Sequence, residues 1–377
     1  MSEIKVNSIK GVGASAAAIT VNNTDGTCTA NVTNRPNENL IINGAMEIQQ
    51  RTAGNYTTVT GGYTGIDRYH VYANPASKLT YEPSTDSPVG FSSSFKITST
   101  SAYTPVSGNY HYVGQRIEGY NWQHLEYGTS NAKTITISFF VKSSITGTWS
   151  GIVKNNAQNR TFAWEYTISS ANTWEKKTIT VPGCPDGTWL TSNGAGAWIY
   201  FCMGSSASGT NYLGSANSWQ STNLIGSTGS NSLPNTNGAT WYMTGLKVEE
   251  GSVATDFEHR SFGQELDLCM RYFQRFVSDN NYQIGMGAYY TANQLKCIIP
   301  FIKEMRSAPS VIQVTGTDYY VFYRNGAADY FDSFGVENTD ERKTCLNNST
   351  QMSGTVGQGG IVRTYNASSR LDLNAEL

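Results

Sequence analysis

Residues 133–144, KTITISFFVKSS, alternate apolar and polar side chains along their length. Successive side chains of an extended chain point to opposite faces. One face of this segment therefore collects four apolar residues: Ile135, Ile137, Phe139 and Val141. The other face carries mainly hydroxyl residues. The segment predicts a β-strand with one buried face and one face that is mostly in contact with water.

Similar runs recur on both sides of this strand, including SSFKITST, TWEKKTITVPG, AWIYFCMGSS and WYMTGLKVEE. Clusters of Gly, Ser, Thr and Asn separate the runs, and no helical period lies between them. This pattern favours a sandwich or jelly roll over a parallel α/β sheet. The nearly uncharged stretch 205–238 is expected to form a long surface loop or a pair of loops.

The predicted fold class is mainly β, with four parts along 377 residues. Their order is a short N-terminal β-hairpin segment (1–38), a β-sandwich of jelly-roll type (39–260), a linking α-helix (261–277) and a smaller C-terminal β domain (278–377). Single cores rarely grow beyond roughly 250 residues, so more than one packed unit is expected.

Composition limits the possible partners. Charged residues are 14% of the chain and the formal net charge is −2, so no basic surface is available to neutralise the phosphates of a nucleic acid. The N-terminus lacks the apolar core of a signal peptide, and no apolar run approaches the roughly 18 residues that span a bilayer. We expect synthesis in the cytoplasm and no membrane insertion. The six cysteines are scattered without metal-ligand spacing and are expected to be buried thiols.

The N-terminal segment contains ITVNNTDGTCTANV, in which Asp25-Gly26 is a two-residue turn signal. Counting outward from the turn pairs Val21 with Ala30 and Ile19 with Val32. An isolated hairpin is marginal in water. Its apolar strip must lie against the rest of the chain, other copies of the hairpin or a docking protein; the linker-like residues that follow favour the last two.

One helix is expected after residue 260. Ser261 and Gln264 form a capping-box pattern, and Phe262, Leu266, Cys269, Phe273 and Phe276 recur at helical spacing. Asp267 and Arg271 are spaced for an i,i+4 ion pair. The same spacing fits a coiled-coil seam, but two heptads are short for one, and a connector packed against a sheet is the favoured interpretation. Strand-like runs then resume, and DYYVFYRNG ends in an Asn325-Gly326 turn signal.

Several segments together resemble a module of tailed-bacteriophage tail fibres and virion spikes. They are NLIINGAMEIQQR (39–51), GIDRYHV (65–71), WYMTGLKVEEGSVATDFEHRSFGQELDLCMRYFQ (241–274), PFIKEMRSAPSV (300–311) and LDLNAEL (371–377). In that family the first segment opens a jelly roll similar to carbohydrate-binding modules, and the segment 241–274 closes it. The leader EIKVNSIK is similar to fibre leaders that attach to the virion. The resemblance implies a homotrimer, located in the virion, that contacts other virion proteins through its N-terminal segment.

The predicted function is that of a non-enzymatic tail fibre or receptor-binding protein that mediates adsorption to host cell-surface polysaccharide. Three alternatives stay open: a capsid head fibre, spike or decoration protein; a glycan-depolymerising tailspike; and a secreted bacterial lectin, which the missing signal peptide disfavours.

Glycan contacts of such proteins use aromatic rings against the apolar side of a sugar and amides or hydroxyls at its rim. One candidate region is YHYVGQRIEGYNWQHLEYG, where Tyr110, Tyr112, Tyr120, Trp122, His124 and Tyr127 surround Arg116 and Glu118. Its simpler interpretation is that alternate members belong to the core. We select Tyr120, Trp122 and His124 from it.

The C-terminal domain supplies the second candidate region. Its candidates are Tyr282, Tyr289, Tyr290, Tyr319, Tyr320, Tyr323 and Arg324, flanked by Asn293, Asn325 and Asp329. Adjacent tyrosines point to opposite faces of a strand, so one of each pair is expected to be outward.

No catalytic residue and no cofactor are predicted. The motifs of nucleophile elbows, zinc helices and phosphate loops are missing. A glycosidase would need two carboxylates, for which Glu165, Glu175 and Asp186 are the available residues. A structural Ca²⁺ is left open, with Glu82, Asp86, Glu249 and Asp256 as the carboxylates that would hold it.

Overall fold

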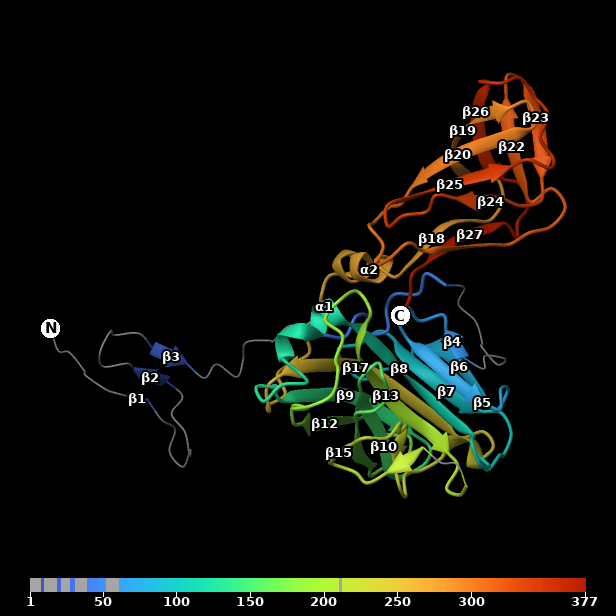
Figure 1. Cartoon of the computed structure of the whole chain (residues 1–377). Coiled ribbons are helices and arrows are strands. Elements are labelled where there is room, and N and C mark those ends of the chain that lie inside the picture. The colour runs from blue at the N-terminus through green and yellow to red at the C-terminus, as the bar shows by residue number, and fades with distance from the viewer. Residues whose placement is uncertain (1–7, 10–18, 22–27, 31–38, 52–60, 210–211) are drawn as a thin grey trace.

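The computed structural model describes residues 8–9, 19–21, 28–30, 39–51, 61–209 and 212–377 (Figure 1). The fold class is mainly β, as predicted. Two antiparallel sheets form a sandwich, called the body below, and two further sheets form a second unit, called the tip. A short helix lies between them.

The N-terminal strands β1 (Ser8–Ile9), β2 (Ile19–Val21) and β3 (Cys28–Ala30) form one antiparallel sheet. The predicted register is wrong by two residues, because Ile19 pairs with Ala30 and Val21 with Cys28. A slip of two residues keeps every side chain on the same face, so the apolar pattern did not distinguish the two registers. The Asp25-Gly26 turn and Val32 lie outside the described residues.

The larger body sheet has seven strands. In spatial order they are β15 (Trp219–Gln220), β11 (Thr161–Ile168), β10 (Gly147–Lys154), β13 (Ala195–Ser205), β8 (Tyr110–Glu118), β5 (His70–Asn74) and β4 (Gly61–Tyr63). After β8 the chain makes the helical turns α1 (Gly119–Trp122) and η1 (Gln123–Leu125).

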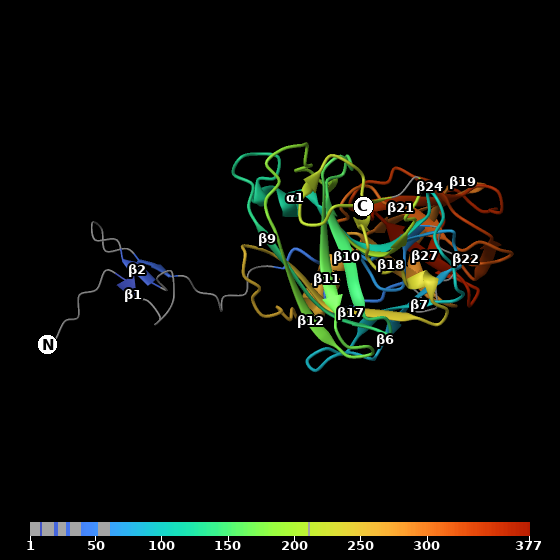
Figure 2. The same ribbon diagram turned by 90° about the horizontal axis from the view of Figure 1, so that it is seen from below.

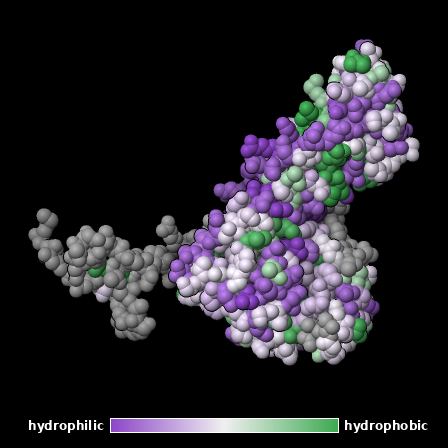
Figure 3. All heavy atoms as spheres, viewed as in Figure 1, coloured by the Kyte–Doolittle hydropathy of each residue, from purple (hydrophilic) through white to green (hydrophobic). Residues whose placement is uncertain are grey.

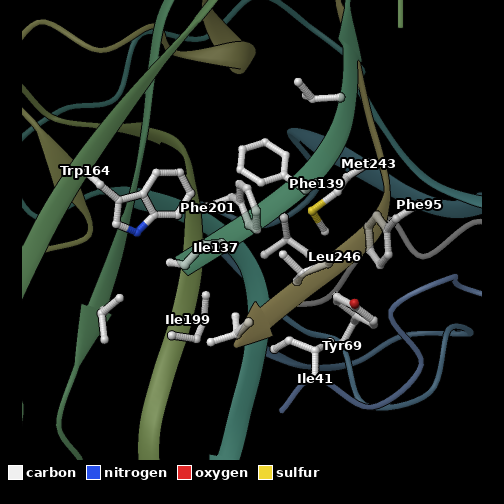
Figure 4. Packing of buried hydrophobic residues seen from close by; sticks show 14 of the residues in the cluster. Ile41, Tyr69, Phe95, Ile137, Phe139, Trp164, Ile199, Phe201, Met243 and Leu246 are labelled. Atoms are coloured by element: carbon white, nitrogen blue, oxygen red, sulfur yellow. The ribbon is translucent and has the colours of Figure 1, made fainter. Parts of the chain in front are cut away.

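The second body sheet has five strands, in the order β12 (Glu175–Val181), β9 (Ile135–Ser143), β17 (Thr240–Glu250), β7 (Ser94–Ser99) and β6 (Leu79–Ser84). Figure 2 shows β10 and β11 of the seven-stranded sheet alongside β12 and β17 of this one. The sheets enclose one apolar core, in which Phe139 of β9 meets Phe201 of β13 edge to face at 4.9 Å between ring centroids (Figure 4). Such contacts stabilise a pair of rings beyond the area they bury.

The strand that contains KTITISFFVKSS is confirmed as β9, and its four predicted core residues are at most 1% exposed. The expectation of a mostly wet outer face is wrong. Thr136 and Ser138 on that face are buried, and the Thr136 hydroxyl donates to the Gly251 carbonyl oxygen at 2.7 Å. The chain after β17 covers this face and supplies hydrogen-bond partners, so its polar residues tolerate burial.

The connection between β13 and β17 is long, as expected, but it packs on the body instead of standing free. It contains β14 (Leu213–Gly214), β15, β16 (Gly226–Ser227) and η2 (Leu233–Asn235). Leu224 and Ile225 are buried against the outer face of the seven-stranded sheet.

The helix α2 (Phe262–Met270) begins with the predicted capping box of Ser261 and Gln264, but it is shorter than predicted. Residues 273–278 form strand β18 (Phe273–Ser278), which pairs with β27 (Arg370–Asn374). The helical spacing of Phe273 and Phe276 is overridden by this strand pairing. The predicted ion pair within the helix is also wrong, because Asp267 pairs with Lys303 and Arg271 with Glu118.

The tip contains a three-stranded sheet, β18–β27–β21 (Ser310–Gln313), and a seven-stranded sheet. The latter runs β23 (Ala327–Phe331), β22 (Tyr320–Arg324), β26 (Gly359–Thr364), β19 (Gln283–Thr291), β20 (Gln294–Pro300), β25 (Lys343–Asn348) and β24 (Gly335–Glu337). The Asn325-Gly326 turn is confirmed: Arg324 pairs with Ala327, and both turn residues have positive φ.

The segments that carry the resemblance meet where body and tip join. Arg68 pairs with Glu376, and Gln50 Nε2 donates to the Phe273 carbonyl oxygen at 2.8 Å. Arg306 Nε donates to the Ala375 carbonyl oxygen at 2.7 Å. Residues from 39–51, 65–71, 241–274, 300–311 and 371–377 therefore build the junction between the two units.

Four of the cysteines, Cys184, Cys202, Cys269 and Cys297, are free and buried, as predicted, whereas Cys345 is free and half-buried. The side chain of Cys28 is outside the described part. Within the described ranges, no helix is both long and apolar enough to cross a bilayer.

Candidate functional site

Aromatic side chains gather on the outer face of the seven-stranded body sheet. Cross-strand register aligns Tyr72 of β5 with Tyr112 of β8, and Tyr200 of β13 lies beside them. Together with other residues they line a hollow of about 350 Å³, called the aromatic pocket below. Its lining is Gly61, His70, Tyr72, Tyr110, Tyr112, Arg116, Lys154, Gln158, Trp198, Asn223 and Ile225.

The rings of this pocket form a nearly parallel stack. Ring centroids of Tyr72 and Tyr110 are 4.6 Å apart with planes 14° from parallel, and those of Tyr112 and Tyr200 are 4.1 Å apart at 13°. Strand alternation explains the set, because residues 110 and 112, like 198 and 200, are two apart and share a face. Burial holds the pKa of Tyr200 well above its ordinary value, so its hydroxyl stays protonated.

Gly114 makes room for this stack. A Cβ built at Gly114 would lie 2.0 Å from the Ile199 carbonyl oxygen and 2.5 Å from Cδ1 of Tyr200. Gly114 is the partner of Tyr200 across β8 and β13. The position therefore requires glycine because the neighbouring backbone and the Tyr200 ring occupy the space of a side chain.

Two cations lie on the same cross-strand row as Trp198. Arg116 pairs with Trp198 across β8 and β13, and Lys154 pairs with Trp198 across β13 and β10. Arg116 Cζ is 4.3 Å and Lys154 Nζ is 4.7 Å from the centroid of the indole. Arg116 Nε also donates to the Tyr200 hydroxyl at 2.8 Å, which fixes the guanidinium at the edge of the ring stack.

Amides complete the rim of the pocket. Lys154 Nζ donates to Gln158 Oε1 at 3.0 Å and to Asn223 Oδ1 at 2.8 Å. Burial, together with the charge of Arg116, lowers the pKa of Lys154 to about 7. The pKa of His70 is lowered to about 3 by burial and by Arg116, so its imidazole is neutral at neutral pH.

The predicted candidates in the first region divide. Tyr120 and His124 are exposed and line a smaller hollow of about 210 Å³ with Asn121 and Arg260. Trp122 is instead 1% exposed, with its ring centroid 4.9 Å from that of Tyr127. The turn α1 folds Trp122 into the core, which leaves no ring face for a ligand.

The predicted candidates in the tip divide as well. Tyr282, Tyr290 and Tyr323 are exposed, whereas Tyr289 and Tyr320 are at most 1% exposed and Tyr319 is half-buried against the tip core. The pair at 289 and 290 behaves as expected for a strand. The pair at 319 and 320 has no fully outward ring, because Tyr319 precedes β22 and packs on the core.

Arg324 is held within the tip. Its Nε donates to Asp329 Oδ2 at 2.8 Å, and the hydroxyl of buried Tyr289 donates to the same carboxylate. Arg324 Nη2 also donates to the Ser353 carbonyl oxygen at 2.7 Å. These contacts give Arg324 a structural position in the β22–β23 hairpin and do not bring it to the exposed tyrosines as one site.

Five of the seven carboxylates considered for Ca²⁺ or catalysis are engaged in other contacts. Glu82 pairs with Lys96 at 2.7 Å and Glu249 with Lys247 at 3.1 Å, and Asp86 pairs with Lys142. Glu175 accepts from the Ser169 and Ser170 amides, and Asp186 pairs with Arg160. Across the part of the chain that the structure describes, no three His, Cys, Asp or Glu residues are grouped to hold a metal ion.

A larger hollow of about 600 Å³ lies beside α2, but its charged lining is largely paired: Asp267 with Lys303, Glu304 with Arg342 and Arg271 with Glu118. The aromatic pocket has the more specific chemistry and is the candidate site.

The sequence pointed to Tyr110, Tyr112 and Arg116 as neighbours, but the predicted site residues omit Tyr72, Lys154, Trp198 and Tyr200. The sequence carries one local sign of these residues, the spacing of two between Trp198 and Tyr200, which places both on one face of a strand. The other residues could not be found in this way, because the pocket is assembled by strands distant in sequence.

No protein-family model and no curated protein sequence matches the chain. Solved structures with a similar course of the chain include an enzymatically active domain of tailspike protein 4 from bacteriophage CBA120, with TM-score 0.30 and 14% identity, covering 56% of this chain and 21% of that chain. A putative sugar-binding protein from Bacteroides thetaiotaomicron has TM-score 0.32 and 12% identity, covering 57% and 100%. A family 11 carbohydrate-binding module from Clostridium thermocellum has TM-score 0.27 and 11% identity, covering 55% and 100%. These values do not place the chain in a family.

Proposed function

We propose that this chain is a non-enzymatic glycan-binding protein and that the aromatic pocket is its binding site. The observation that supports the proposal is the stack of Tyr72, Tyr110, Tyr112 and Tyr200 beside Trp198, with amides and cations at its rim. The half-buried rings of Tyr72 and Tyr110 cover the C–H side of a sugar, and the buried rings of Tyr112 and Tyr200 support them from beneath. The rim groups bond the sugar hydroxyls. The volume is at the small end of the roughly 300–1,000 Å³ of ligand sites, which suits a short saccharide unit.

We further propose that the protein acts in bacteriophage adsorption as a virion fibre or spike. The support for this part is the sequence resemblance in the segments at the junction of body and tip. In that setting the protein assembles as a homotrimer, whose three pockets strengthen a weak glycan contact through effective concentration. Light scattering of the purified full chain measures the assembly, and a monomer mass would contradict it.

The binding proposal is tested with immobilised bacterial polysaccharides and the purified full chain. Tyr72→Ala removes one half-buried ring of the stack and should abolish most retention. Tyr323→Ala, an exposed tyrosine of the tip, is the matched control and should bind normally. Thermal unfolding of both variants checks that they are folded. If only the tip variant loses binding, the receptor contacts lie on the tip and the pocket assignment is wrong.

Three further measurements separate the alternatives. Incubation with each retained polysaccharide should release no reducing ends, because no Asp or Glu is among the described residues that line the pocket. Release would favour a depolymerising tailspike. Labelling of virions distinguishes a tail fibre from a capsid fibre. Pre-incubation of cells with the protein should reduce adsorption of the phage that encodes it if the protein is the receptor-binding fibre.

A further inference from the structure

We infer that the glycan bound in the aromatic pocket is acidic, and that its carboxylate or phosphate group lies against Lys154 beside Trp198. The inference rests on the proposed function, which it deepens by naming the chemical class of the ligand. It follows from three features that the described residues give the pocket: a buried cation without a carboxylate partner among them, a second cation on the same indole, and polar nitrogen atoms that none of them satisfies.

Lys154 differs from the other buried cations of the body. It is 1% exposed, and among the described residues it donates to two neutral amide oxygens, on Gln158 and Asn223. In contrast, buried Arg68 pairs with Glu376, and buried Lys247 pairs with Glu249. A buried charge is costly unless an opposite charge compensates it. A ligand anion would provide this compensation for Lys154.

Arg116 adds positive charge at the same place. Its guanidinium and the Lys154 ammonium group both lie within 5 Å of the Trp198 ring centroid. Arg116 donates to the Tyr200 hydroxyl and to the main-chain oxygen of Leu377. No Asp or Glu is among the described residues that line the pocket. Residues 52–60, which precede the lining residue Gly61 in the sequence, also contain no acidic residue.

Two buried nitrogen atoms in the same lining have no hydrogen-bond partner among the described residues. They are Trp198 Nε1 and His70 Nδ1. An indole N–H is only a donor, so Trp198 requires an acceptor oxygen to satisfy it. Buried polar groups in folded proteins are nearly always hydrogen-bonded. Sugar hydroxyls and an acidic group would supply these oxygens in a site that the tyrosine rings already shape.

The depressed pKa of Lys154 supports the same assignment. Near neutral pH the lysine is poised between its charged and neutral forms. An anion placed beside it favours the charged form, so binding is coupled to uptake of a proton. A neutral saccharide would gain nothing from this coupling. The pocket therefore discriminates between acidic and neutral sugars that have the same ring shape.

The experiment compares native and charge-removed forms of the polysaccharides that the full chain retains. Uronic acid carboxyls are reduced to primary alcohols in one arm, and phosphate groups are removed with hydrogen fluoride in the other. The arm that abolishes retention identifies the source of the anion. Lys154→Met should weaken binding of the untreated glycan about tenfold to hundredfold, the range for a hydrogen bond to a charged group. Lys154→Arg should restore part of it.

Lys96→Met is the control for a general loss of positive charge, because Lys96 lies on β7 in the other body sheet. It should bind like the wild type. Equal retention of native and charge-removed glycans, or unchanged binding by Lys154→Met, would overturn the inference and leave glycan binding intact. Retention of neutral glycans alone would also overturn the inference that the ligand is acidic. If no glycan is retained at all, the proposed function itself fails.

Discussion

The molecule contains two seven-stranded antiparallel sheets whose outer faces differ. On the body sheet, the rings of Tyr112, Trp198 and Tyr200 are at most 8% exposed. They line the aromatic pocket together with cations and amides. On the tip sheet, strand register places Tyr323, Ile361 and Met286 side by side across three strands. Gly287 pairs with Cys297 on the next antiparallel strand, so Ile298 lies beside Met286 and extends this row. These four residues, called the apolar row below, are 36–79% exposed.

The difference originates in what covers each sheet. The connection between β13 and β17 packs Leu224 and Ile225 against the body sheet and places Asn223 beside Lys154. The apolar row of the tip lacks such a cover within the described residues, and Figure 3 shows apolar residues on the visible surface of the tip. A sheet face becomes a pocket for a small polar ligand when a loop closes part of it, whereas an open apolar face of this kind is typical of a macromolecular contact.

The largest expected contrast concerns one ring from each sheet. Tyr200→Ala should lower the free energy of unfolding by about 3–5 kcal/mol, because it removes a fully buried ring and leaves a cavity. Tyr290→Ala in the tip should cost about 1 kcal/mol or less, since the ring is 66% exposed and Lys296 Nζ lies over it at 4.7 Å from the ring centroid. Urea unfolding of both variants measures the difference. Equal losses would mean that the two faces are covered to the same degree.

A smaller contrast is expected between two glycines. Gly114→Ala should destabilise the body by about 1–3 kcal/mol and weaken glycan binding, because the added Cβ overlaps the Ile199 carbonyl oxygen and the Tyr200 ring. Gly359→Ala in β26 should change stability by less than about 1 kcal/mol, since the nearest atom to its Cβ is 3.8 Å away. Urea unfolding and retention on the polysaccharide are the two readouts. Normal binding by a folded Gly114→Ala variant would mean that the ring stack is not part of the binding site.

The lysines of the two sheets should differ in their pH dependence. The pKa of Lys154 is about 7 in the folded chain and near 10.5 when unfolded, so the unfolded state binds more protons between these values. Stability should therefore rise with pH from about 7 to 9, by roughly 2 kcal/mol. Arg116 and Tyr200 lie next to Lys154, and His70 lines the same pocket. Arg116 and Tyr200 stay protonated and His70 stays neutral throughout this window.

Lys154→Met should abolish this rise, and Lys296→Met should retain it, because Lys296 is paired with Glu337 at the tip surface. Denaturant unfolding at several pH values, without ligand, measures the slope. A slope that survives in Lys154→Met would assign it to another group.

The fold could be predicted further than the site, and the reason is physical. Alternation along β9 and the Asn325-Gly326 turn are local signals, and both are confirmed. The end of α2 was missed because β18 pairs with β27, nearly a hundred residues away in sequence. Tyr72, Lys154 and Trp198 come together only through the strand order β5–β8–β13–β10, which no local pattern specifies.

The position of the segments that carry the resemblance also explains why they did not identify the residues of the pocket. Its segments meet at the junction of body and tip, where Arg68 pairs with Glu376 and Glu118 accepts from Arg271 and Tyr272. Of the residues argued to contact a ligand, only His70 lies within these segments. The motifs therefore report how the two units are joined, and most of the pocket is built from residues outside them.

The smallest expected effect concerns the apolar row of the tip. Met286→Gln should change the free energy of unfolding of the isolated chain by less than about 0.5 kcal/mol, because the side chain is 79% exposed. Unfolding measured at low and high protein concentration tests whether the row is free. A loss of several kcal/mol that grows with concentration would show that the row is buried between copies of the chain. The open face of the tip would then be an assembly surface. The two sheets would differ in function, because the tip sheet would contact other subunits and the body sheet would bind a sugar.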